Sequence, residues 1–118
     1  MGRIAFAGCI VVAGCIALAG CNGDRRYAER DAARHLIAQN CAGCHRVPGV
    51  REARGRVGPS LDGIGAQQII AGHFANNPQM LSRWIEHPQQ LLPGNAMPET
   101  GLSPEQARLI TNYLYTLD

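Results

Sequence analysis

Two cysteines and a histidine in the run Cys41-Ala42-Gly43-Cys44-His45 have the spacing needed to hold a redox cofactor. This C-x-x-C-H pattern is the attachment signature of c-type haem. The two thiols add to the two vinyl groups of one porphyrin, and the histidine that follows gives an imidazole nitrogen to the iron. Ala42 and Gly43 are small, so the backbone can lie close to the ring. The run predicts one covalent haem c, attached through Cys41 and Cys44, with His45 as an axial iron ligand.

Two other chemistries use a C-x-x-C pair. A zinc site would need a second pair of ligands at matching spacing, and no other cysteine pair follows Cys44. A thioredoxin-like redox pair would need a surrounding βαβ pattern, which the chain does not show. Haem attachment therefore fits the sequence better than either alternative.

The segments around this motif resemble, in order, those of class I cytochromes c. The motif is followed by VGPSL at residues 57–61, PGNAMP at residues 93–98, and an amphipathic C-terminal stretch. The resemblance covers roughly residues 26–117. It implies an all-α class I cytochrome c fold, with three to five helices wrapped around one covalently attached haem.

The resemblance also implies roles for three residues outside the motif. Met97 matches the family's second axial ligand, in a stiff loop between Pro93 and Pro98. Pro59 matches the proline whose carbonyl accepts the Nδ1–H of the ligand histidine, a bond that fixes the imidazole tautomer. Trp84 matches a tryptophan that packs on the haem and donates to a propionate, although an ordinary core position fits it equally well.

Three other side chains compete with Met97 for the iron. Met80 lies at helical spacing with Trp84, so core packing suits it better than ligation. His73 and His87 could act as bis-histidine ligands, but both lie outside the family pattern. Met97 is therefore the predicted second ligand.

Helices separated by loops would position these residues. Candidate N-caps at Asp24, Asn77 and Ser103 predict helices over residues 25–39, over residues 78–86 and from residue 104 onward. Gln106 completes a capping box with Ser103. The intervening stretches predict a short helical turn and loop over residues 61–77 and a proline-rich loop over residues 89–100.

The first 21 residues predict export and a lipid anchor. Arg3 precedes an uncharged stretch, as in a secretory signal peptide. The stretch ends in LAGC at residues 18–21, which resembles a bacterial lipobox whose cysteine, Cys21, is lipidated. An uncleaved membrane anchor is the alternative. The expected organisation is a lipoprotein signal peptide over residues 1–20, a tether over residues 21–25 and a cytochrome c domain over residues 26–118.

The charge limits the possible partners, and the cysteine count limits the possible disulfides. The formal net charge of +2 is too small to indicate a nucleic-acid partner. Cys9 and Cys15 lie in the predicted signal peptide. The lipid on Cys21 and the haem on Cys41 and Cys44 would account for the other cysteines, so none would be left for a disulfide. The loop over residues 46–56 is rich in arginine, which fits either a solvated loop or a docking patch for an acidic partner.

These observations predict an electron carrier rather than an enzyme. It would transfer one electron at a time on the periplasmic side of a bacterial membrane, either inner or outer. The implied redox partners are a quinol–cytochrome c reductase, a terminal oxidase or a periplasmic dehydrogenase. Two alternatives remain: a haem-binding subunit of a larger dehydrogenase or oxidase complex, and an open-site haem enzyme or gas sensor.

Overall fold

Four α-helices contain nearly half of the residues of the computed structural model, which describes residues 17–117 and their side chains from residue 22 onward. They are α1 (Ala17–Asn40), α2 (Pro78–Glu86), α3 (Pro88–Leu91) and α4 (Pro104–Leu114). Between α1 and α2 lie a short 3₁₀ helix, η1 (Ile64–Ala66), and a hairpin of β1 (Ile69–Ile70) and β2 (Phe74–Ala75). The predicted all-α architecture is confirmed.

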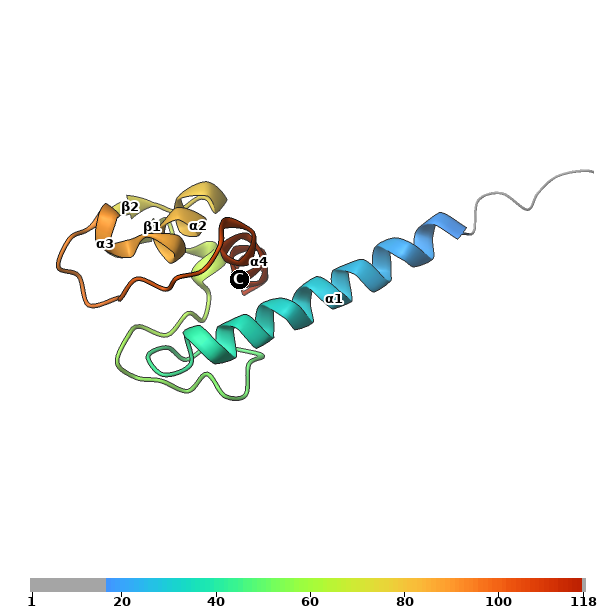
Figure 1. Cartoon of the computed structure of the whole chain (residues 1–118), viewed down its shortest axis with the longest axis horizontal. Coiled ribbons are helices and arrows are strands. Elements are labelled where there is room, and N and C mark those ends of the chain that lie inside the picture. The colour runs from blue at the N-terminus through green and yellow to red at the C-terminus, as the bar shows by residue number, and fades with distance from the viewer. Residues whose placement is uncertain (1–16, 118) are drawn as a thin grey trace, which may run out of the picture.

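Helix α4 packs against both α1 and α2 (Figure 1). It starts as predicted, because the Ser103 hydroxyl accepts a hydrogen bond from the Gln106 backbone N–H and the Gln106 side chain accepts one from the Ser103 N–H. This capping box satisfies two N–H groups that a helix start leaves free. The buried side chains of α4 are Ala107, Ile110, Thr111, Tyr113 and Leu114.

Helix α2 also begins and ends as predicted. The Asn77 side chain accepts a hydrogen bond from the Met80 backbone N–H at 2.8 Å, and Pro78 occupies the first helical position. The buried side chains of α2 are those of Leu81 and Ile85. Met80 is partly buried and packs against the core, as its helical spacing indicated.

Helix α1 is longer than predicted. The expected start at Arg25 was wrong, since the helix is continuous from Ala17 and Asp24 lies inside it rather than at its cap. The segment expected to be a tether is therefore helical over residues 22–25. Arg25 and Glu29 are four residues apart and form an ion pair at 3.2 Å, which stabilises this part of the helix.

Two short elements were not predicted. The β1–β2 hairpin occupies a stretch expected to be a helical turn and loop, and α3 lies within the expected proline-rich loop. The hairpin is held to the C-terminus by Asn76, whose side-chain N–H₂ donates to the carbonyls of Ile64 and Gln67. Its amide oxygen accepts from the Tyr115 hydroxyl at 2.6 Å. One polar side chain thus ties η1, the hairpin and the end of α4 together.

The core lies where α4 meets α1 and α2 and extends beneath the loop that follows α1. Its side chains are mostly small or aliphatic: Ala33, Ile37, Val47, Val50, Ala53, Ile64, Ile70, Leu81, Ile85, Ala107, Ile110, Tyr113 and Leu114.

Within residues 17–117, no helix combines the length and the hydropathy needed to cross a membrane. Most of the predicted signal peptide and the side chain of Cys21 lie outside the described residues, so both remain predictions.

Candidate functional site

The C-x-x-C-H run forms the turn that directly follows α1. The backbone N–H of Cys41 donates to the Ile37 carbonyl, and that of His45 donates to the Cys41 carbonyl, both at 2.9 Å. The chain therefore keeps helix-like spacing through the motif. Side chains three and four residues apart neighbour one another on such a turn. The end of α1 thus brings two thiols and an imidazole close together.

Both cysteines are free thiols, but their surroundings differ. Cys44 is exposed, whereas Cys41 is partly buried and packs against the core. Burial raises the pKa of the Cys41 thiol to about 11, and the nearby Cys44 adds to the rise. Before the haem is attached, the Cys41 thiol is therefore neutral at physiological pH.

The His45 imidazole is oriented by a backbone carbonyl. Its Nδ1 lies 2.7 Å from the Pro59 oxygen. A carbonyl can only accept, so Nδ1 carries the proton and Nε2 keeps its lone pair for a metal. This is the contact that the resemblance implies for Pro59. A second bond, from the Gly58 N–H to the Cys44 carbonyl at 2.7 Å, holds the Gly58-Pro59 segment against the motif.

Two glycines allow the backbone to approach the motif closely. A Cβ on Gly58 would lie 2.5 Å from Cε1 and 2.8 Å from Nδ1 of His45. A Cβ on Gly55 would lie 2.6 Å from the backbone nitrogen of His45. Real Cβ atoms do not make contacts this short. Sequence reasoning missed Gly55, because nothing in an arginine-rich loop indicates which backbone atoms it will touch.

Gly58→Ala should disturb His45 directly. The added methyl group would push the imidazole away from the Pro59 carbonyl, and overpacking of this kind costs ~1–3 kcal/mol. We expect a lower free energy of unfolding in denaturant titration and a shifted reduction potential. Gly23→Ala is the control, because a Cβ there meets nothing within 4 Å; since Gly23 lies in α1, this change should raise the free energy of unfolding by up to ~1 kcal/mol and leave the reduction potential unchanged. If Gly58→Ala left both quantities unchanged, the imidazole would have more freedom than the structure shows.

The loop over residues 46–56 is anchored on one side and exposed on the other. Val47, Val50 and Ala53 are buried, and the Tyr113 hydroxyl of α4 donates to the Pro48 carbonyl at 2.7 Å. The arginines at positions 51, 54 and 56 remain exposed. Tyr113 thus fixes the loop that folds back over the haem motif.

Met97 lies in the loop between α3 and α4, with its backbone held on both sides. Its N–H donates to the Asn95 side-chain oxygen, and its carbonyl accepts from the Gln89 side chain, both at 2.7 Å. Gln89 also donates to the Asn95 carbonyl, and Asn95 donates to the Pro88 carbonyl, both at 2.9 Å. The sequence indicated a loop stiffened by prolines, but two side-chain amides supply its hydrogen bonds. In Figure 1 this orange loop lies above the green segment that follows α1.

The competing ligand candidates have other neighbours. His87 lies between two carboxylates, 3.8 Å from Glu86 and 3.6 Å from Glu99. His73 lies beside Phe74, with ring centroids 6.2 Å apart. Trp84 also lies beside Phe74, with ring centroids 5.8 Å apart. Trp84 therefore has an aromatic packing partner on β2, and its predicted contact with the haem stays a prediction.

The donor set fits a covalently attached porphyrin. It offers two free thiols on one turn, an imidazole with Nε2 available, and a glycine where any side chain would displace that imidazole. Among the residues that the structure describes, no group of three or more His, Cys, Asp or Glu side chains is arranged to hold a metal ion.

Comparisons with known proteins agree on one family. The sequence profile of cytochrome c matches residues 30–118. A cytochrome c2 from Rhodopila globiformis is 33% identical over 97 residues, which cover 71% of this chain and 89% of that protein. A solved structure, the c-type cytochrome SorU from Sinorhizobium meliloti, aligns with a TM-score of 0.54 at 20% identity. That alignment covers 77% of this chain and 92% of SorU.

A second group of relatives is much longer than this chain. Cytochrome c oxidase subunit 2 from Alkalihalophilus pseudofirmus is 37% identical over 86 residues, which cover 71% of this chain. The same protein from Bacillus sp. is 36% identical over 86 residues. The match covers 24% of each of these subunits, so the chain spans about a quarter of their length.

Proposed function

The chain belongs to the cytochrome c family, and from this we propose a membrane-tethered one-electron carrier with His45 and Met97 as axial ligands. The predicted class I cytochrome c fold and the predicted covalent haem c both follow from the family. When bound, the haem supplies one-electron chemistry by cycling between ferric and ferrous iron. The protein residues attach it, orient its ligands and limit access to the iron.

The hydrogen bond between His45 and Pro59 is the observation that carries the proposal. It leaves Nε2 as the only ring nitrogen with a free lone pair, and Nε2 is the atom that would bind the iron. A carbonyl partner on the opposite nitrogen also makes the imidazole a better donor. Such an oriented imidazole suits a ligand that remains in place through many redox cycles.

The hydrogen bonds around Met97 favour a carrier over an open-site enzyme. Gln89 and Asn95 together hold both backbone polar groups of Met97, so the loop has little freedom to withdraw its side chain. A ligand that stays bound through the redox change keeps reorganisation small and closes the iron to small molecules. We therefore place this protein among electron carriers rather than enzymes.

Its relatives suggest a second candidate function, as a subunit of a terminal oxidase complex. The observation that favours it is the 37% identity to part of cytochrome c oxidase subunit 2. Such a subunit would pass electrons to the oxidase, which is also one of the partners proposed for a free carrier. A quinol–cytochrome c reductase or a periplasmic dehydrogenase would supply the electrons.

The proposed tether is a lipid on Cys21, on the periplasmic side of a bacterial membrane. Cys21 lies within the continuous helix α1, so α1 itself would link the anchor to the haem motif. A helical link rises ~1.5 Å per residue and fixes the height of the domain above the membrane more closely than a flexible tether would.

Mass spectrometry of the detergent-purified full chain tests the tether and the haem together. We expect one species that begins at acylated Cys21 and carries the mass of one haem. Cys21→Ser is the matched variant, and it should keep the haem but lose the acyl mass. A wild-type chain that begins at Met1 without acyl groups would contradict the lipidation and favour an uncleaved anchor.

A further inference from the structure

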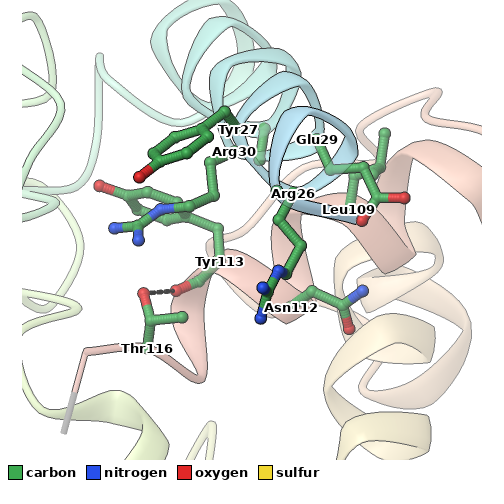
Figure 2. A pocket seen from close by; sticks show the side chains of 10 residues that line it. Arg26, Tyr27, Glu29, Arg30, Leu109, Asn112, Tyr113 and Thr116 are labelled. Carbon is green, nitrogen blue, oxygen red and sulfur yellow. Dashed lines mark hydrogen bonds between the residues drawn. The ribbon is translucent and has the colours of Figure 1, made fainter. Parts of the chain in front are cut away.

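A groove with a volume of about 470 Å³ lies between α1 and α4, away from the haem motif. Figure 2 shows Tyr27 and Arg30 of α1 above Tyr113 of α4, and Arg26 of α1 between Tyr113 and Leu109. We call it the α1–α4 groove. Neither the haem ligands nor the loops that hold them contribute to its lining.

The charge of the groove comes from two arginines without acidic partners. Glu29 also lines it, but that carboxylate is paired with Arg25 at 3.2 Å. Arg26 and Arg30 form no ion pair with any residue between 22 and 117. Because they are four residues apart on one helix, their like charges face the same side and repel. An anion between them would relieve this repulsion.

The rest of the groove is apolar or aromatic. Ala33 and Tyr113 are buried at its base, and Leu109 is partly buried. Tyr27 is 72% exposed at its edge, which is unusual for a large aromatic side chain. Tyrosine beside arginine is typical of surfaces that lie at the boundary between membrane and water. The lining therefore suits an amphiphile with an anionic head.

The groove lies at the end of α1 that carries the proposed anchor. Gly23, which lines the groove, is two residues after Cys21. At ~1.5 Å per helical residue, Arg26 and Arg30 lie about 8 and 14 Å along the helix from Cys21. With acyl chains on Cys21 in the bilayer, both guanidinium groups would lie near the layer of lipid phosphates.

We propose that the α1–α4 groove binds the headgroup of an anionic phospholipid. The phosphate pairs with Arg26 and Arg30, while the apolar lining and Tyr27 contact the adjoining glycerol and acyl region. This proposal rests on the lipidation of Cys21 for its geometry, and it adds a lipid class to the proposed function. Binding would fix the orientation of the haem domain on the membrane surface.

Native mass spectrometry of the full-length holoprotein, released from detergent micelles, tests this directly. Phosphatidylglycerol and phosphatidylcholine are added separately, and the lipid adducts of each are titrated. We expect phosphatidylglycerol to bind more tightly, and Arg26→Gln with Arg30→Gln to reduce that preference roughly thirty-fold, as for two basic groups at an anionic lipid surface. The control variant, Arg51→Gln with Arg54→Gln, changes two exposed arginines outside the groove and should keep the preference.

Three results would overturn the proposal. They are equal binding of the two lipids, an unchanged preference in the Arg26 and Arg30 double variant, and displacement of the lipid by an acidic peptide such as polyglutamate at equal charge. The last result would make the groove a protein-docking surface. The same spectra report the acyl and haem masses, so a failure of the proposed anchor or cofactor is seen separately from a failure of lipid recognition.

Discussion

Met97→Ala should open the haem iron to carbon monoxide and lower the reduction potential. A neutral thioether sulfur favours ferrous iron, so its loss should shift the potential by a substantial part of the ~0.8 V that axial ligands span. The loop itself should keep its shape, because only backbone groups of Met97 take part: its N–H donates to the Asn95 side chain and its carbonyl accepts from the Gln89 side chain. Carbon monoxide titration of the ferrous protein and redox potentiometry measure the two effects.

Met80→Ala is the matched control for this prediction. Met80 packs against the core from α2, so its truncation should mainly destabilise the fold, by about 2 kcal/mol at the low end of the range for Met→Ala. It should leave carbon monoxide binding and the potential close to those of the wild type. The opposite pattern, with ligand loss in Met80→Ala and none in Met97→Ala, would show that the wrong methionine was assigned.

The double change Cys41→Ala and Cys44→Ala should remove the covalent haem and much of the fold's stability. The core contains many small side chains, among them Ala33, Ala53 and Ala107, and only 5% of the chain is aromatic. A bound porphyrin therefore contributes much of the buried apolar area in a domain of this size. Because domains of this kind are stable by only ~5–15 kcal/mol, its loss should leave the chain largely unfolded.

Haem-stained denaturing electrophoresis and circular dichroism measure the two parts of this result. The wild-type band should keep its stain, and the double variant should lose both the stain and most of its helical signal. Cys44→Ala alone should keep one thioether bond and show an intermediate stability. Cys21→Ser should keep the stain in full. Haem that leaves the wild-type chain under denaturing conditions would rule out covalent attachment.

The sequence predicted the helices whose starts carry local signals. Asn77 and Ser103 are N-caps followed by proline, and α2 and α4 begin there. Local signals misled at Asp24, because a good capping residue also occurs inside helices, and α1 extends N-terminal to Asp24 as far as Ala17. The β1–β2 hairpin was missed because strands of two residues are too short to show an alternating pattern.

The sequence predicted the chemistry of the site, but not the contacts that hold its residues in place. The spacing of Cys41, Cys44 and His45 indicated haem directly, and the family resemblance indicated Pro59. No sequence pattern showed that Gly55 would lie against the motif or that Gln89 would hold the Met97 carbonyl. These contacts join loops that are distant in the chain or depend on the path of a loop, and only the folded structure fixes them.

Carbon monoxide binding by the ferrous wild-type protein at neutral pH tests the central claim most directly. The claim is a haem closed by His45 on one side and Met97 on the other, which serves electron transfer alone. We predict slow and weak binding, because Met97 must leave the iron first and its loop is held by Gln89 and Asn95. Rapid, tight binding by the wild type would contradict this account and would make the protein an open-site haem enzyme or gas sensor.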